Sequence, residues 1–137
     1  MTKHSTLNVI TQGQGLLEIT RQLESVVQQA KVGLGMCHLF VQHTSCSLLI
    51  QENADPSARR DLESWLNRLV PENDSLYTHI YEGSDDMPAH IKASLTATSL
   101  SIPIIDGRLA LGTWQGVYLW EHRHSQHNRR IIAHIQE

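Results

Sequence analysis

The chain has 137 residues, of which 40% are hydrophobic and 18% charged, and its formal net charge is −3. This size and composition fit one globular domain spanning residues 1–137 with a single core. The charge excludes the broad basic field that drives non-specific nucleic-acid binding, and no stretch approaches the ~20 apolar residues of a membrane helix. We therefore expect a cytoplasmic protein with no nucleic-acid partner and no membrane partner.

Two residue types stand out in the composition. Cys37 and Cys46 form no CxxC motif and lie in or beside a hydrophobic run, which favours reduced packing thiols over a disulfide. The nine histidines are several times the usual number for a chain of this length. Because imidazole is a common metal ligand, they justify a search for a metal site.

The N-terminal region is predicted to form a hairpin followed by a helix. Apolar side chains alternate along 3–11, and the turn Gly13 to Gly15 leads into a second short run, 16–19. This pattern predicts a β-hairpin. Thr20 is then predicted to cap a helix that ends before Gly33. The apolar stripe of this helix is Leu23, Val26, Val27 and Ala30.

The stretch 36–56 combines a buried strand with a cluster of polar groups. Side chains that alternate along the strand share one face, so the apolar row through Leu39 and Val41 continues into His43 and Ser45. Glu52 and Asn53 follow the next apolar run, 48–50. This density of polar groups is typical of a site, but a hydrogen-bonded core histidine followed by turn and capping residues explains the same pattern.

The middle of the chain is predicted to contain two helices and a strand between them. Asp55 followed by Pro56 is a strong helix start, and apolar residues then repeat at helical spacing up to Pro71, which places Trp65 and Leu66 in the core. Residues 76–81 alternate as a strand. The segment after them has an Asp-rich start and a proline in the first turn of a helix, with Ile91 and Leu95 as its buried stripe.

Four more strands are predicted in the C-terminal third, at 100–104, 108–111, 114–121 and 129–135. Asp106-Gly107 between the first two is a type I′ hairpin signal. Strands thus outnumber helices, and most neighbours along the chain are joined by short turns. The fold class is therefore α+β: one domain of largely antiparallel, sandwich-like sheets with about three helices.

Three histidines stand where separate elements could converge: His43, His79 and His90. A three-histidine set with an open position binds zinc and activates a bound water. Each also has a simpler explanation: His43 as a hydrogen-bonded core histidine, His79 as a residue packed between two tyrosines, and His90 as an exposed helix residue. Packing or solvated roles are favoured for His122, His124, His127 and His134. Arg123, Arg129 and Arg130 form a basic cluster that could meet a phosphate or remain a solvated face.

Five motifs together resemble those of the YjbQ family, small proteins described as having a secondary thiamine-phosphate synthase activity. The similarity covers nearly the whole chain. The motifs are HTS (43–45), QENADP (51–56), YTHIYEG (77–83), DMPAHIKAS (86–94) and GRLALGTWQGVYLWEHR (107–123).

The resemblance implies a homotrimer with clefts between subunits. It implies a divalent metal, zinc or alternatively magnesium, held by His43, His79 and His90, and catalytic or positioning roles for Glu52 and Asn53. A small phosphorylated substrate would be the ligand. The residues expected to bind it are Ser45, Lys92, Arg108, Thr113, Trp114 and Gln115.

Three functions are open on this basis. The first is a weak thiamine-phosphate synthase, which joins hydroxymethylpyrimidine diphosphate to a thiazole phosphate while cations stabilise the departing diphosphate. The second is a metal-dependent hydrolase with Glu52 as its general base. The third is a metal-binding or ligand-binding trimer without catalysis.

Overall fold

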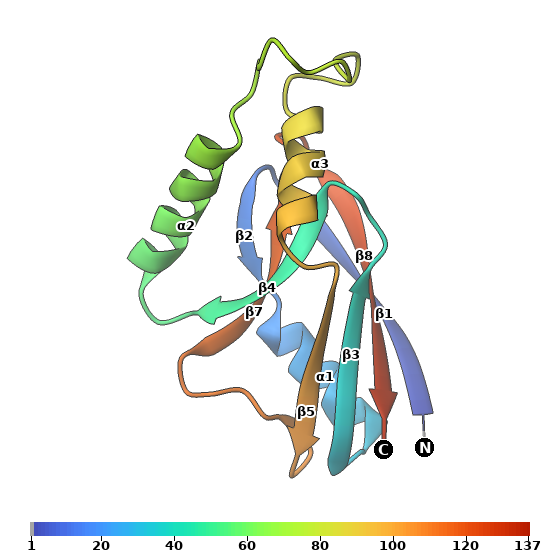
Figure 1. Cartoon of the computed structure of the whole chain (residues 1–137). Coiled ribbons are helices and arrows are strands. Elements are labelled where there is room, and N and C mark those ends of the chain that lie inside the picture. The colour runs from blue at the N-terminus through green and yellow to red at the C-terminus, as the bar shows by residue number, and fades with distance from the viewer. Residues whose placement is uncertain (1) are drawn as a thin grey trace.

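Two antiparallel sheets face each other across a common hydrophobic core (Figure 1), in a computed structural model that describes residues 2–137. One sheet has the strand order β1-β8-β3-β5-β6 and the other β2-β7-β4. The strands are β1 Thr2–Thr11, β2 Gly15–Glu18, β3 Leu34–Val41, β4 Cys46–Glu52, β5 Ser99–Ile105, β6 Arg108–Leu109, β7 Gln115–Glu121 and β8 His127–Gln136. The helices are α1 Thr20–Ala30, α2 Pro56–Leu69 and α3 Asp86–Leu95. The expected α+β class is confirmed.

The predicted N-terminal hairpin is wrong, because β1 and β2 belong to different sheets. β1 pairs with β8 along its whole length, from Thr2↔Gln136 to Thr11↔His127, whereas β2 pairs with β7. Gly13 and Gly15 have φ values of 126° and 142°, a region that suits glycine. They let the chain pass from one sheet to the other instead of folding back on itself.

Helix α1 matches the prediction in its bounds and its buried face. Leu23 and Val27 are completely buried, and the helix ends at Lys31 in the left-handed conformation. Thr20 does not cap the helix. Its hydroxyl donates to Glu18 Oε2 at 2.8 Å and accepts from the Val117 N–H at 2.8 Å, so it fastens the start of the helix to β7.

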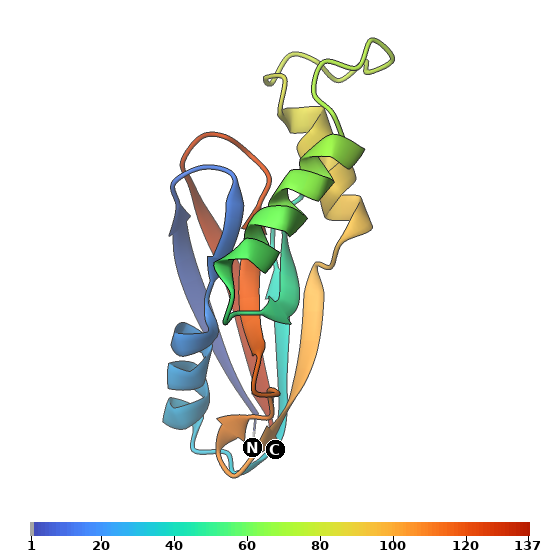
Figure 2. The ribbon, with the colours of Figure 1, turned by 90° about the vertical axis from the view of Figure 1, so that its left-hand side faces the viewer.

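Helix α2 starts as predicted but buries less than predicted. Asp55 is the N-cap and accepts from the Ser57 N–H at 2.9 Å, with Pro56 at the first helical position. Leu66 alone is fully buried among the helical residues, where it packs with Tyr118 and Trp120. Trp65 is 49% exposed, so its predicted core position is wrong. This helix lies on one side of the narrow three-stranded sheet and crosses it at a slant (green in Figure 2), so only part of its surface is covered.

The region between α2 and α3 is a loop rather than the predicted strand at 76–81. Turn contacts hold it, since Asp74 accepts from the Leu76 N–H and the Tyr77 hydroxyl donates to the Pro71 carbonyl at 2.9 Å. The buried stripe of α3 is also out of phase with the prediction, because Leu95 is 59% exposed. The buried side chains of α3 are Asp86, Pro88, Ala89, Lys92 and Ala93.

The remaining elements agree with the sequence. Asp106 and Gly107 have φ values of 53° and 76°, as a type I′ turn requires, and they join β5 to β6. Both cysteines are free and buried, and burial raises the pKa of Cys37 to about 11 and that of Cys46 to about 12. None of the helices in the described residues is long and apolar enough to span a bilayer.

Candidate functional site

Two imidazoles converge on one carboxylate at the start of α3. Asp86 Oδ2 lies 2.6 Å from Nε2 of His79 and 3.1 Å from Nε2 of His90. Ligand atoms of all three side chains lie within 4.8 Å of one another. Asp86 is buried, whereas the two imidazoles are partly exposed, so the group is open to solvent on one side.

Two segments supply this group and a third supports it. His79 comes from the loop before α3, Asp86 is the first residue of that helix, and His90 follows one turn later on the same face. Arg123, just after β7, donates to Asp86 Oδ1 at 2.6 Å and to Asp85 Oδ2 at 3.0 Å. Burial alone would raise the pKa of Asp86, but the bond from His79 and the charge of Arg123 outweigh it and lower the pKa.

The protonation pattern of His90 follows from its two neighbours. Its Nδ1 lies 3.1 Å from the Thr44 carbonyl, which can only accept a hydrogen bond, so Nδ1 carries a proton. In the neutral tautomer the Nε2 lone pair then faces Asp86 Oδ2. Two facing lone pairs repel, so this atom pair requires a proton or a cation between them. A backbone carbonyl that orients a histidine in this way is a common feature of metal sites.

The structure brings together two of the three predicted metal ligands. His43 lies elsewhere, with Nε2 accepting from the Arg130 N–H at 2.8 Å and Nδ1 3.4 Å from Arg129 Nη1. Burial, followed by the charge of Arg129, lowers the pKa of His43. Sequence reasoning did not single out Asp86. The four-residue spacing between Asp86 and His90 on one helix was the available signal.

A buried ionic network surrounds Ser45. Arg129 donates to Ser45 Oγ at 2.9 Å and, through Nε, to Glu121 Oε1 at 2.7 Å, while Thr11 donates to the same carboxylate oxygen at 2.7 Å. Ser45 is therefore a structural acceptor within the chain. Because Arg123 and Arg129 both have carboxylate partners, the predicted basic cluster is largely neutralised.

The predicted catalytic residues stand at the other end of β4. Strand β4 runs for seven residues from Cys46 to Glu52, so its two ends lie about 20 Å apart at the usual rise per residue. Glu52 Oε2 accepts from the Asp55 N–H at 3.2 Å, and Asn53 Nδ2 donates to Glu18 Oε2 at 3.0 Å. Within one chain, Glu52 and Asn53 thus form a polar group separate from His79, Asp86 and His90.

The residues of the GTWQG run, 112–116, lie beside Glu52 and Asn53 rather than beside the histidines. The Asn53 N–H donates to the Trp114 carbonyl at 3.0 Å, and Gln115 Oε1 accepts from the Gly112 N–H at 2.7 Å. Thr113, Trp114 and Gln115 are all exposed. This loop therefore presents side chains to solvent beside the end of β4.

The two cations predicted to meet a diphosphate lie in other places. Lys92 is only 3% exposed, its Nζ donates to Asn67 Oδ1 at 2.6 Å, and burial lowers its pKa. Arg108 is exposed on the β5–β6 hairpin, at the opposite end of the molecule from the loop before α3 (Figure 1). Neither residue stands as a free cation beside His79.

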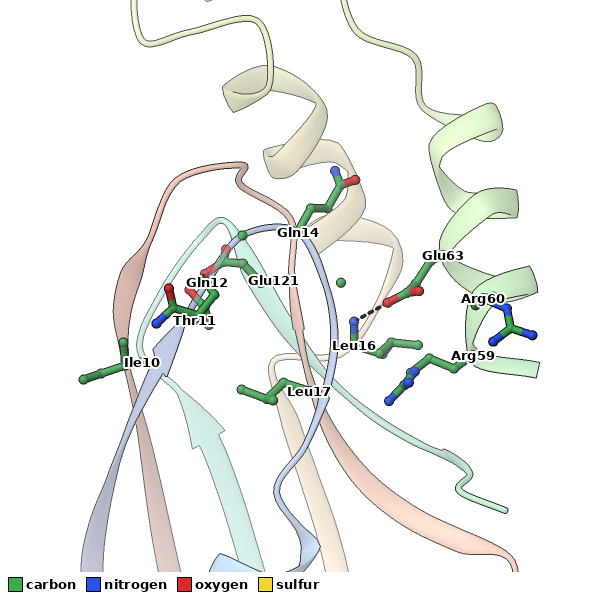
Figure 3. Close-up of a pocket in the computed structure, with 12 residues that line it drawn as sticks. Ile10, Thr11, Gln12, Gln14, Leu16, Leu17, Arg59, Arg60, Glu63 and Glu121 are labelled. Carbon is green, nitrogen blue, oxygen red and sulfur yellow. Dashed lines mark hydrogen bonds between the residues drawn. The ribbon is translucent and has the colours of Figure 1, made fainter. Parts of the chain in front are cut away.

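Two hollows bear on ligand binding. A small one of about 140 Å³ is lined by His79, Tyr77 and Ile80, among others. A larger one of about 400 Å³ lies between the β1–β2 turn and α2 (Figure 3), and sequence reasoning missed it. Arg59 and Arg60 line it together with Glu63, whose carboxylate accepts from the Leu16 N–H at 2.7 Å. It contains none of the predicted site residues.

The fold and the histidine–carboxylate group define a small α+β protein with a candidate metal centre at a loop–helix junction. A family model described as "UPF0047 protein YjbQ-like" matches residues 5–137, and the chain belongs to this family. It is 52% identical over 134 residues to a UPF0047 protein of Synechocystis sp., covering 97% of this chain and 91% of the relative. It is 44% identical over 137 residues to the UPF0047 protein YjbQ of Escherichia coli O157:H7, covering 99% of both.

Solved structures share the fold. A crystal structure of a YjbQ/UPF0047 family protein from Clostridium acetobutylicum has a TM-score of 0.85 at 34% identity, covering 98% of this chain and 99% of that one. A hypothetical protein from Aeropyrum pernix reaches a TM-score of 0.88 at 21% identity, covering 98% of both chains. The two-sheet architecture is therefore shared by proteins of quite different sequence.

Proposed function

We propose that this chain is a metal-dependent enzyme acting on a small phosphorylated substrate, with a thiamine-phosphate synthase-like condensation as its activity. The observation that carries the proposal is the shared contact of Asp86 Oδ2 with Nε2 of both His79 and His90. Two imidazoles and one carboxylate are a donor set typical of catalytic zinc, and they suit zinc better than magnesium, which prefers oxygen ligands.

The residues around this set favour ligand roles. The contact of the Thr44 carbonyl with Nδ1 of His90 favours the tautomer in which the lone pair of Nε2 faces Asp86. Arg123 donates to the other oxygen of that carboxylate. A bound divalent cation would supply positive charge to a departing diphosphate. This matters because Lys92 is buried against Asn67 and is not free to do so.

In the condensation, the bond between the pyrimidine methylene carbon and the diphosphate oxygen breaks, and pyrophosphate leaves with the electron pair. A new bond forms between that carbon and the thiazole nitrogen. Glu52 and Asn53 stand at the opposite end of β4, so they can serve this reaction only in a site that a second copy of the chain completes. The homotrimer implied by the family resemblance is the assembly we propose for this purpose.

A metal-dependent hydrolase is the second candidate. Three protein ligands leave a coordination position for water, and zinc lowers the pKa of such a water to about 7. The partial exposure of His79 and His90 favours access for water. In this reaction the attacking group would be water instead of a thiazole nitrogen, so product analysis separates the two candidates.

The test uses protein purified without a histidine tag. We expect Asp86→Asn to lower the metal content by one equivalent and to abolish the activity, because the amide loses the charge that pairs with the cation. His124→Gln is the matched control, since His124 lies nearby and pairs with Glu72 rather than with Asp86. Unchanged metal content in Asp86→Asn would overturn the proposed centre.

The products then identify the reaction. Thiamine phosphate formed from the two precursors supports the transferase, and orthophosphate released from a panel of phosphate esters supports the hydrolase. Metal bound without either product would support the third function, a binding protein without catalysis.

A further inference from the structure

A second group of histidines forms a row on the five-stranded sheet. His4 on β1 pairs in register with His134 on β8, and His134 pairs in register with His38 on β3. Residues that face each other across paired strands project from the same side of a sheet, so all three imidazoles lie on one face. Core residues such as Ile135 and Cys37 occupy the opposite face.

The ring contacts within this row are close. His134 Nδ1 lies 2.6 Å from His4 Nε2, and the two rings meet edge to face with their centroids 4.5 Å apart. The His38 ring stands on the other side of His134, with its centroid 6.0 Å away. His38 Nδ1 lies 2.9 Å from the hydroxyl of Ser101 on β5. Nε2 is therefore the nitrogen of His38 that remains for a metal.

A shared cation needs one ring nitrogen from each histidine, and those of His4 and His134 already face each other. For a cation above the central strand β8, the nitrogen within reach on His134 is Nδ1, the one closer to its backbone. On the flanking His4 and His38 it is Nε2, the one farther from the backbone. Zinc–nitrogen bonds are about 2.0–2.1 Å, so two bound nitrogens sit roughly 3.3 Å apart in a tetrahedral site. The His4–His134 pair must open by less than about 1 Å to reach this spacing, and His38 must swing inward about its side-chain bonds.

The surroundings suit a positive ion. The neighbouring rows on this face are Thr2, Gln136 and Met36 on one side and Thr6, Ile132 and Phe40 on the other. All six side chains are uncharged, so no ammonium or guanidinium in these rows repels a metal. Ser101 contacts Nδ1 of His38, the ring nitrogen not assigned to the ion, in the way that supporting groups orient metal-bound histidines.

We propose that His4, His38 and His134 form a second metal site, selective for ions that favour imidazole, such as Zn²⁺ and Ni²⁺. The ion would tie the edge strand β1 to β8 and β3, close to the paired residues Thr2 and Gln136 at the ends of β1 and β8. This role is structural and does not depend on the proposed centre at Asp86.

The experiment is a calorimetric titration of tag-free Asp86→Asn protein with Zn²⁺. We expect one equivalent to bind in Asp86→Asn and none when His134→Gln is added. Ser101→Ala should weaken binding about tenfold, the usual effect of losing a supporting group. His127→Gln, also on β8 but outside both groups, should bind like its parent.

The outcomes distinguish this site from the proposed centre. If the unsubstituted protein binds one equivalent that His134→Gln removes and Asp86→Asn does not, the sheet site stands and the centre at Asp86 fails. If Asp86→Asn binds no Zn²⁺, or if the added His134→Gln leaves binding unchanged, the sheet site is refuted. Zn²⁺ should also raise the melting temperature of Asp86→Asn but not of the double variant.

Discussion

Arg129 and Glu121 form a buried ion pair that joins the two sheets, since Arg129 lies on β8 and Glu121 ends β7. Burial alone would raise the pKa of Glu121, but hydrogen bonds from Arg129 and Thr11 lower it. Arg129→Met would leave this carboxylate buried without its cation, so we expect a loss of about 3–5 kcal/mol of unfolding free energy. Urea denaturation at pH 7 measures it.

The matched control for this pair is the double variant Glu121→Met/Arg129→Met. It removes both charges, so it should recover part of the loss seen in Arg129→Met. Recovery is incomplete because Thr11 and the Arg123 N–H lose their acceptor. If the double variant is as unstable as the sum of the two single ones, the pair is not coupled in the way proposed.

We expect His122 to make the stability of the protein sensitive to mild acid. It is buried, its Nε2 contacts the Ser47 hydroxyl at 2.9 Å, and its Nδ1 has no hydrogen-bond partner among the described residues. Burial, with the charge of Lys92, lowers the pKa of His122 to about 3. The unfolded chain binds a proton near pH 6.5 while the folded chain does not, so stability is full above that pH and falls as the pH drops towards 3.

We expect the unfolding free energy to fall by about 1 kcal/mol per pH unit below pH 6 through this group. His122→Gln removes the titration, so its stability should change less between pH 7 and pH 5, whatever its absolute value. Denaturant titrations at four pH values measure both slopes. Equal slopes for the two proteins would show that folding does not lower the pKa of His122.

The success of sequence reasoning depended on whether local signals decided the outcome. Asp55-Pro56 and Asp106-Gly107 were read correctly because a cap and a type I′ turn are fixed by neighbouring residues. The hairpin at Gly13 failed because sheet membership depends on partners more than a hundred residues away. His79 and His90 were found as site candidates, but Asp86 was not. The helical pattern of α3 identifies buried positions by their apolar residues, so it does not detect a buried carboxylate.

Trp65 and Leu66 illustrate the same limit on helix α2. Helical spacing assigned both to the buried face, yet Trp65 is 49% exposed and Leu66 only 2%. We expect Leu66→Ala to cost about 2–5 kcal/mol, because it opens a cavity against Tyr118 and Trp120. Trp65→Ala should cost less than 1 kcal/mol as an order-of-magnitude limit for an exposed position. Thermal melts of both variants test the contrast, and a larger loss in Trp65→Ala would mean that another surface covers the indole.

A metal-binding test distinguishes His90 from His43 as a metal ligand. In one chain His90 faces Asp86, whereas both nitrogens of His43 face Arg129 and Arg130. We expect His90→Ala to lower the metal content by one equivalent and His43→Ala to leave it unchanged, as measured by elemental analysis of tag-free protein. Loss of metal in both variants would instead support the ligand set that the motifs imply, with His43 as a member.

Glu52 decides whether the polar group at the end of β4 belongs to a site or to the scaffold. Its carboxylate accepts from the Asp55 N–H at 3.2 Å, just before the start of α2, so the backbone there is held by the sheet on one side and a capped helix on the other. Glu52→Gln keeps the shape and a hydrogen-bond acceptor while removing the charge. If Glu52 is an acid, base or substrate anchor, activity should fall by about two to four orders of magnitude. The melting temperature should hardly change.

Glu63→Gln is the matched control for Glu52→Gln, because Glu63 is also a partly buried carboxylate that accepts from a backbone N–H, that of Leu16. We expect it to resemble Glu52→Gln in stability and the unsubstituted protein in activity. Both quantities should be measured on each variant. If Glu52→Gln loses several kcal/mol of stability, on the order of a broken buried ion pair, yet keeps normal activity per folded molecule, then Glu52 stabilises a structural contact and takes no part in the site.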